Sequence, residues 1–330
     1  MTTILRQIDG YEAARLNRSY YTSDINSADL HFFTYAMYNG YQAAVAKYLY
    51  HYIENFKKNE KQISILELGA HGVYFEEGVY REFWMLDMLK NANLRGRVEY
   101  RIVDISQKSI ELAEKTYESA SQRYFVTKFF VNDVIQEELP PNNDIIIMNE
   151  LLDDLTHKVI VRTENGELQE AVFDLECIGN KTWLSQNGFK RIEGIPEKDL
   201  LRIGEGLGKG EAITYSAEIN PLFDNIARNL KQNGLVFVHD YFVKSASRAN
   251  GLKRPYGSIT CDKKEPIEGK VQITSDVNFG EVVYAMEEHG FELIMAIPTE
   301  DFIYNTQQAY RPNAEGSTSR YLNIAGIKRT

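Results

Sequence analysis

Three strand-like segments in the first half of the chain each end in residues that suit a nucleoside ligand. The first, at 63–68, runs into Glu67-Leu68-Gly69-Ala70-His71-Gly72, where two glycines let the backbone approach a ligand closely. The second ends at Asp104, whose carboxylate can accept two hydrogen bonds from a ribose diol. The third ends at Asp133, which can accept from an adenine amine. Each acid alone is more often a turn former or helix cap, but the succession predicts a nucleoside site.

A fourth segment, the apolar run at 144–148, is followed by an amide and three carboxylates, namely Asn149, Glu150, Asp153 and Asp154. Because ligands of doubly wound sheets sit at the carboxyl ends of the strands, at least one of these polar side chains should face that crevice. The other interpretation is a solvated helix start, in which the aspartates interact favourably with the helix dipole.

A fifth segment at 234–238 leads into His239 and Asp240. Neighbouring residues on a strand point to opposite faces, so only one of these two side chains can reach the crevice.

These segments alternate with helices, which indicates a parallel sheet with helices on both faces. The predicted strands are 63–68, 98–105, 124–131, 144–148, 234–238, 291–297 and 321–327, and the predicted helices are 77–91, 109–120, 217–230 and 279–289. The fold class is therefore α/β.

Two insertions and an N-terminal segment interrupt or precede this alternation. Strands at 158–162 and 168–173 flank Asn165-Gly166, which predicts a hairpin inside an insertion at about 156–215. Residues 245–276 are expected to form a long loop, of the kind that is usually functional or disordered.

Residues 1–60 are expected to be a helical segment before a cofactor-binding domain at 61–330. The aromatic-rich stretch at 28–59 predicts two helices joined at Asn39-Gly40, either packed into the core or forming a lid over a ligand.

Composition excludes several classes of protein. The 330 residues carry a net charge of −10, which argues against a nucleic acid partner, because such affinity comes from Lys and Arg. Cys177 and Cys261 are too few for a disulfide framework or a four-cysteine zinc site, and the histidines show no ligand spacing, so no metal is expected. No apolar run approaches the ~20 residues of a membrane helix, and Asp9 and Glu12 stand where a signal peptide would be apolar. A cytoplasmic protein that does not interact with membranes is expected.

The order of the motifs ILELGAHG, YRIVDIS, NDIIIMNELLDDL, GLVFVHDY and VQITSDVNFGEVV resembles the MidA-like family of S-adenosylmethionine-dependent methyltransferases. That family includes the mitochondrial complex I assembly factor that methylates a protein arginine. GLVFVHDY is similar to the family's LLIDYG, and ITSDVNF is similar to its D-[IL]-T-A-H-V-D-F. These two motifs distinguish the family, whereas motifs like ILELGAHG and YRIVDIS occur in most class I methyltransferases. The resemblance runs from about Tyr20 to the C-terminus.

The resemblance implies a class I, Rossmann-like sheet of seven strands, the last two antiparallel, with S-adenosyl-L-methionine as the cofactor. It implies that Asp104 binds the ribose and Asp133 the adenine region. It implies further cofactor contacts from Glu67, Gly69, Gly72 and Asn149.

The methyl-transfer site would contain Glu150, Asp153 and Asp240, which are the expected catalytic residues. The family pattern also favours Asp240 over His239 as the side chain that reaches the crevice.

Three departures from the family pattern predict a divergent substrate. His71 stands at the second glycine position of the family's G-P-G-R-G-T-L loop, and Asp276 replaces the histidine of T-A-H-V. The usual N-terminus is replaced by the aromatic helical segment.

The leading hypothesis is methylation of a cationic nitrogen on a protein, peptide or small molecule, because the chain is acidic and carboxylates follow the fourth strand. A homodimer is left open. One alternative is O- or C-methylation of an acyl or natural-product substrate, with His71 or His239 as the base. Another is a noncatalytic assembly or interaction factor that keeps the fold.

Overall fold

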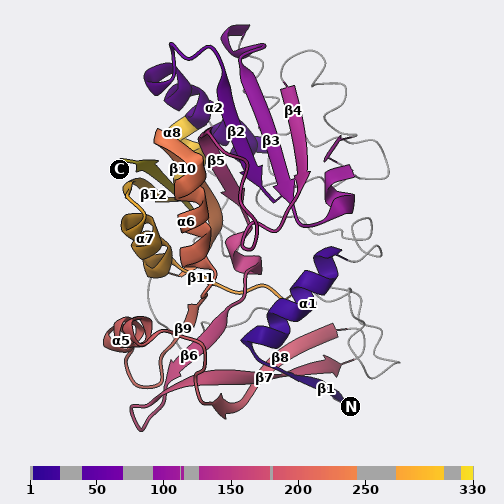
Figure 1. Cartoon of the computed structure of the whole chain (residues 1–330). Helices are drawn as coiled ribbons and strands as arrows, with labels where there is room; N and C mark the ends of the chain where they lie inside the picture. The colour runs from indigo at the N-terminus through magenta and orange to yellow at the C-terminus, as the bar shows by residue number, and fades with distance from the viewer. Residues whose placement is uncertain are drawn as a thin grey trace. The chain divides into compact units, whose positions relative to one another are not determined.

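A computed structural model describes residues 3–22, 39–69, 92–111, 113–114, 126–178, 181–243, 273–307 and 321–329 (Figure 1). The chain divides into two compact units, and each contains its own sheet. The sheet unit comprises residues 27–151, 222–240 and 286–330, and the insertion unit comprises 1–26, 152–221 and 241–285.

Seven strands in the order β12-β13-β10-β5-β2-β3-β4 form the sheet of the sheet unit. Their bounds are β2 (Ile63–Leu68), β3 (Val98–Asp104), β4 (Val126–Val131), β5 (Asn143–Asn149), β10 (Leu230–Val243), β12 (Phe291–Pro298) and β13 (Tyr321–Lys328). The strands β4, β3, β2, β5 and β10 are parallel, and β12 is antiparallel to β13. The predicted doubly wound sheet with an antiparallel last pair is confirmed.

The strand order reverses at β2, because β3 and β4 follow on one side while β5 and β10 follow on the other. In open α/β sheets the ligand crevice lies at such a switch point, outside the carboxyl ends of the strands. The topology therefore directs the search for a site to the ends of β2, β3, β4, β5 and β10.

Helices α2 (Asn39–Phe56) and α8 (Thr299–Gln307) pack against one face of this sheet. The alternating side chains of the strands on that face are apolar and fully or almost fully buried, which is what drives the two helices onto it. The core there includes Ala44, Val45, Leu49, Ile53, Ile63, Ile65, Tyr100, Ile102, Ile145, Ile147, Leu235, Phe237 and Phe302.

Helices α6 (Ile219–Asn229) and α7 (Phe279–Glu288) contribute residues to the other face. The rings of Phe223 and Phe291 meet edge to face with centroids 6.1 Å apart. The side chain of Met286 lies directly against Gly326 of β13, where a Cβ atom would collide with it. A side chain at position 326 would therefore require the Met286 side chain to move.

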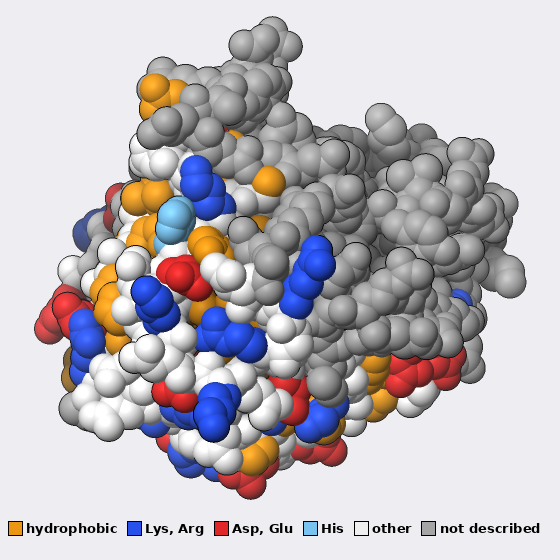
Figure 2. All heavy atoms as spheres, turned by 90° about the horizontal axis from the view of Figure 1, so that it is seen from above, with side chains coloured by type: hydrophobic (Ala, Val, Ile, Leu, Met, Phe, Trp, Pro, Cys, Tyr) orange, Lys and Arg blue, Asp and Glu red, His pale blue; other side chains and the backbone are white. Residues whose placement is uncertain are grey.

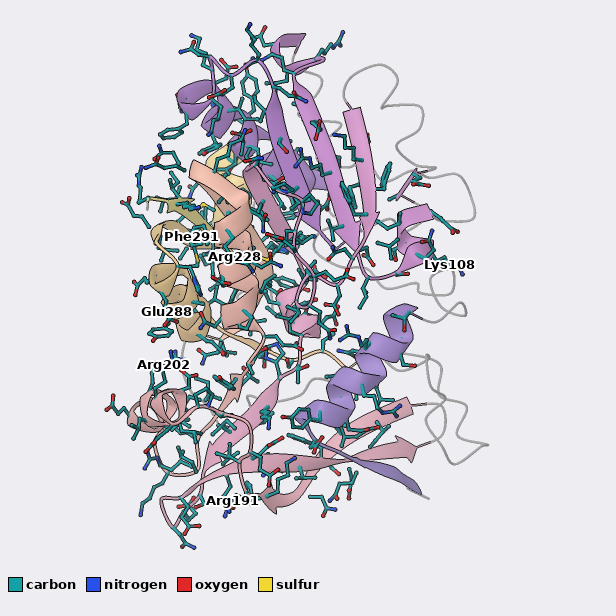
Figure 3. All side chains as sticks on the ribbon, in the orientation of Figure 1. Lys108, Arg191, Arg202, Arg228, Glu288 and Phe291 are labelled. Atoms are coloured by element: carbon teal, nitrogen blue, oxygen red, sulfur yellow. The ribbon has the colours of Figure 1, made fainter. Side chains whose placement is uncertain are left out.

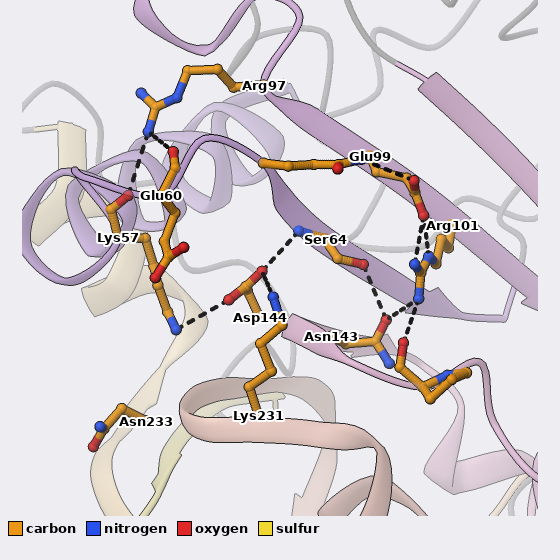
Figure 4. Close-up of polar contacts among 12 residues, drawn as sticks. Lys57, Glu60, Ser64, Arg97, Glu99, Arg101, Asn143, Asp144, Lys231 and Asn233 are labelled. Atoms are coloured by element: carbon orange, nitrogen blue, oxygen red, sulfur yellow. Dashed lines mark hydrogen bonds and ion pairs between the residues drawn. The ribbon is translucent and has the colours of Figure 1, made fainter.

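A charged network closes the amino edge of the same sheet (Figure 4). The carboxylate of Asp144 is fully buried; its Oδ1 lies 3.1 Å from Lys57 Nζ, and its Oδ2 lies 2.8 Å from Lys231 Nζ. The Ser64 N–H also donates to Oδ2, at 3.0 Å. Since Lys57 directly follows α2, this network ties the end of that helix to β2, β5 and β10.

The insertion unit contains a second, antiparallel sheet in the order β1-β7-β6-β9, with β8 paired to β7. Its elements are β1 (Thr3–Ile8), α1 (Gly10–Thr22), β6 (Lys158–Arg162), β7 (Leu168–Ile178), β8 (Lys181–Lys190), α5 (Glu197–Gly206) and β9 (Ala212–Tyr215). The strand β11 (Val277–Asn278) pairs with residues 242–243 of β10 within this unit. The predicted hairpin is present, and Gly166 takes φ +88° in its turn.

Several elements differ from the sequence-based expectation. Residues 1–26 are grouped with the insertion unit, and β1 is a strand where a helical segment was expected. Strand β8 and helix α5 lie in a stretch without a clear pattern, and α8 was not predicted. The expected helix at 77–91, most of the one at 109–120, the first helix of the aromatic stretch and most of the loop at 245–276 lie outside the described residues.

Basic and acidic side chains are interleaved over the described part of the face shown in Figure 2. Within the described ranges, no helix is long and apolar enough to span a membrane, and no group of His, Cys, Asp and Glu side chains could hold a metal ion.

Candidate functional site

The carboxyl ends of the five parallel strands are aligned along one edge of the sheet unit. Leu68 of β2 is in register with Val103 and with Met148, and the Gly69 N–H donates to the Val103 carbonyl at 2.8 Å. Across the next pair of strands, the Glu150 N–H donates to the His239 carbonyl at 2.8 Å. The turns after these strands therefore start side by side.

The end of β2 has the backbone that a ligand-binding turn requires. Gly69 has φ +87°, a conformation that side chains disfavour. Glu67, two residues before it, is buried with 3% of its surface exposed. The structure thus supports an unusual turn at the first predicted glycine, whereas His71 and Gly72 lie outside the described residues.

Asp104 and Asp133, at the ends of β3 and β4, are half-buried and cap their own turns. Asp104 Oδ1 accepts the Ser106 N–H at 2.7 Å, and Asp133 Oδ1 accepts the Ile135 N–H at 3.1 Å. The turn-forming role expected of short acids is therefore present at both positions. Each carboxylate has two oxygens, so this role is compatible with ligand binding.

Strand alternation brings Glu67, Asn149 and His239 to the same face of the sheet. Asn149 is in register with His239, and Glu67 is in register with Ile147, which shares a face with Asn149. Along these strands, buried apolar residues give way to polar ones at the carboxyl end. This is the face that α2 covers, so polar groups meet the first turn of that helix.

Tyr41, in that first turn, is the residue on which the polar groups converge. It is 2% exposed, its hydroxyl donates to Asn149 Oδ1 at 3.4 Å, and its ring centroid lies 4.4 Å from that of His239. Burial raises the pKa of Tyr41 well above its ordinary value, and the negative charges of Glu150, Glu67 and Asp240 raise it further. Tyr41 therefore remains a neutral hydrogen-bond donor beside three carboxylates.

Tyr41 was not among the site residues predicted from the sequence, because it is one of many aromatic residues in its segment. The available signal was positional: Tyr41 follows Asn39-Gly40, at the start of the helix that precedes the first strand of the sheet.

Glu150 adopts a left-handed backbone conformation with φ +48°. In the described part of the chain, the other non-glycine residues with positive φ are Asn142 and Asn233, a type that tolerates this region. A glutamate held there stores roughly 1–3 kcal/mol of strain, and such strain concentrates at functional sites. The backbone thus marks Glu150 independently of its charge.

Of the other expected catalytic residues, Asp240 is fully buried in the sheet unit, and Asp153 belongs to the insertion unit. Asp153 is 3% exposed, and its carbonyl accepts the Ser275 N–H at 3.1 Å. In the same unit, Asn17 bonds the backbone of Ile273 through both its amide nitrogen and its amide oxygen. Segment 273–276 and the turn holding Asp153 are thus fixed together.

Comparison with known proteins decides the family. Residues 44–297, more than three quarters of the chain, match the family model described as "Putative S-adenosyl-L-methionine-dependent methyltransferase". The chain belongs to this methyltransferase family. The resemblance to MidA-like methyltransferases is thereby confirmed, as is S-adenosyl-L-methionine as the cofactor.

Two solved structures have the same fold as this methyltransferase. One is an uncharacterised superfamily protein from Burkholderia thailandensis, with a TM-score of 0.63 and 15% identity, covering 97% of this chain and 87% of the other. The second is a member of that superfamily from the same organism, bound to S-adenosyl-homocysteine, with a TM-score of 0.63, 15% identity and coverage of 97% and 88%. No curated protein matches the sequence.

The insertion unit of the methyltransferase contains a buried acid with a shifted pKa. Glu281 of α7 is 4% exposed, and its two carboxylate oxygens accept the Ser216 N–H at 3.1 and 3.2 Å. The pKa of Glu281 is raised from 4.5 to about 8; burial is the main cause and Asp199 adds to it, while the Ser216 N–H and Arg202 oppose the shift. Arg202 projects from α5 (Figure 3), and its guanidinium lies 4.4 Å from the ring of Tyr284.

This pKa predicts a pH-dependent stability. Because the folded protein holds the Glu281 proton more tightly than the unfolded chain, its stabilising effect is complete below pH 4.5 and is lost as pH rises towards 8. Over that window the loss is roughly 1.4 kcal/mol per pH unit at most. Glu281→Gln should remove this loss. In urea unfolding, the free energy of unfolding of the variant relative to wild type should therefore increase from pH 5 to pH 8. Parallel stability profiles would contradict the assignment.

Proposed function

We propose that this methyltransferase acts on a cationic nitrogen, a guanidino or amino group of a protein, peptide or small molecule. The observation that supports this proposal is that the negative charges of Glu150 and Asp240, at the carboxyl ends of the strands, both act on the buried Tyr41 hydroxyl. Carboxylates at the end of the parallel strands favour a positively charged ligand over a carboxylate or phosphate. The net charge of −10 acts in the same direction at long range.

The polar residues at the strand ends fit S-adenosyl-L-methionine. In this proposal Asp104 accepts from the ribose hydroxyls, Asp133 from the adenine amine, and Gly69 leaves space for the methionine part. Glu67, Gly72 and Asn149 complete the cofactor residues. The carboxylate of Glu67 suits the cofactor's ammonium group, and the Asn149 amide suits a neutral polar contact.

When bound, S-adenosyl-L-methionine supplies an electrophilic methyl group: an N–C bond forms from the nitrogen electron pair while the C–S bond breaks onto sulfur, giving S-adenosylhomocysteine and a proton. The chain's own contribution is positioning and electrostatics. Glu150 holds the cationic acceptor and compensates its charge as the proton leaves. Asp240, buried in β10 of the same unit, supplies further negative charge for the acceptor. The role of Asp153, which belongs to the insertion unit, stays a prediction from the sequence.

Transfer of a labelled methyl group tests the proposed acceptor class. The enzyme would be incubated with methyl-labelled cofactor and with peptide and metabolite fractions separated by charge. The label should enter cationic compounds and resist mild alkali, because N-methyl groups survive where methyl esters are hydrolysed. Label in alkali-labile esters, or on carbon of an acyl compound, would replace nitrogen methylation by the O- or C-methyl alternative.

Asp104→Ala should weaken the binding of S-adenosylhomocysteine about 10- to 100-fold, because two hydrogen bonds to a charged acceptor are lost. Isothermal titration measures this directly and needs no acceptor. Glu99→Gln, on the same strand at its amino end, is the matched control and should bind like wild type. Equal affinity of Asp104→Ala and the control would exclude Asp104 as the ribose ligand.

A further inference from the structure

His239 is held in the sheet unit by three neighbours. It is fully buried, and its Nδ1 lies 2.7 Å from Asn149 Oδ1. Its ring stacks on the ring of Tyr321, with centroids 5.2 Å apart and planes inclined by 10°. A second ring contact is made with Tyr41, with centroids 4.4 Å apart. Aromatic contacts at these distances restrict rotation of the imidazole.

The amide of Asn149 turns its oxygen towards both His239 and Tyr41. An amide oxygen only accepts hydrogen bonds, so the short contact from His239 requires the Nδ1–H tautomer of the imidazole. The Tyr41 hydroxyl donates to the same oxygen at 3.4 Å. Two donors on the oxygen direct the Asn149 NH₂ group away from both rings.

The strong partner of Asn149 is the histidine. The contact from His239 is 0.7 Å shorter than the one from Tyr41, and only the His239 contact has the length of an ordinary hydrogen bond. The histidine is also tied to Asn149 through the backbone, because the two residues are in register on adjacent strands. The orientation of the amide therefore depends mainly on one imidazole.

We propose that His239 is a positioning residue for the methyl-transfer site, acting through Asn149. The imidazole fixes the amide of Asn149 so that its NH₂ group is presented to the cofactor. This role rests on the proposed function, in which Asn149 contacts the cofactor. In this arrangement the Nδ1–H of His239 is committed to Asn149, and the imidazole ring contacts the rings of Tyr41 and Tyr321.

A double-mutant cycle read by binding of S-adenosylhomocysteine tests this role. His239→Leu removes the donor and should raise the Kd about tenfold, the effect of losing one hydrogen bond. Asn149→Ala should raise it by at least the same factor. Because His239 acts through Asn149, the double variant should bind like Asn149→Ala alone. His239→Asn places an amide donor near the former Nδ1 and should restore affinity to within threefold of wild type.

Each outcome has a distinct meaning. If the Kd of the double variant rises about a hundredfold, the product of the two single effects, His239 affects binding independently of Asn149 and the inference is overturned. Wild-type affinity in His239→Leu, with a loss in Asn149→Ala, would overturn the inference alone. Wild-type affinity in Asn149→Ala would remove the cofactor role of Asn149 and the inference with it. Thermal unfolding midpoints of all variants show whether a loss of affinity comes from misfolding. If His239→Leu is misfolded, the affinity of His239→Asn is the test: near wild type it supports the inference, and a tenfold loss overturns it.

Discussion

Glu150→Gln should lower kcat about 10³-fold, within the range that a charged group acting in the transition state contributes. The substitution preserves the size of the side chain and one acceptor oxygen, so the turn at this left-handed position should keep its geometry. What disappears is the negative charge that compensates the acceptor nitrogen. Methyl transfer to the acceptor found in the labelling experiment is the measurement.

The affinity of this variant for S-adenosylhomocysteine should stay within about threefold of wild type, since Glu150 is assigned to the acceptor. Glu60→Gln, an exposed glutamate at the other edge of the sheet, serves as the control and should keep full activity. A Glu150→Gln enzyme with normal kcat would exclude the carboxylate from the reaction. Loss of cofactor binding without loss of kcat would assign it to the cofactor instead.

Asp144→Asn should destabilise the protein by about 3–5 kcal/mol, the usual cost of removing one member of a buried ion pair. The Lys57 side chain is only 8% exposed, so the substitution leaves an uncompensated ammonium group inside the protein. Lys231 is 39% exposed and can reach water, so it should contribute less. Urea unfolding at pH 7 measures the change.

An exposed ion pair is the matched control for this prediction. Arg329 Nε lies 2.6 Å from Glu292 Oε2, and the two side chains are 47% and 57% exposed. Glu292→Gln should therefore cost less than about 1 kcal/mol. If both variants lose the same free energy, burial is not what makes the Asp144 network important.

The sheet could be predicted from sequence because its signals are local. The strand at 63–68 was predicted with the bounds the structure gives it, and the strand predicted at 144–148 lies within the fully buried β5. Polar residues at consecutive strand ends identified the edge where Glu67, Asn149 and Asp240 lie. Parallel topology then determines that such ends come together.

The rest depended on long-range contacts that no local pattern encodes. The strand β1 owes its conformation to pairing with β7, far along the chain. Tyr41 differs from the neighbouring aromatic residues in its tertiary contact with Asn149, which no local pattern indicates. Asp240 was preferred over His239 only because the family pattern placed it in the crevice. The hydrogen bond between His239 and Asn149 could not be predicted, because the register between β5 and β10 is not visible in the sequence.

The order of the strands in space has a consequence for synthesis on the ribosome. β1 pairs with β7, so at 5–20 residues per second the first strand waits roughly ten to thirty seconds for its partner to be translated. β13, translated after every other strand, occupies an interior slot between β12 and β10. Neither sheet can be completed while the nascent chain is still short. The larger sheet can therefore close only once β13 has left the ribosome, and the free edge of β10 stays unpaired until then.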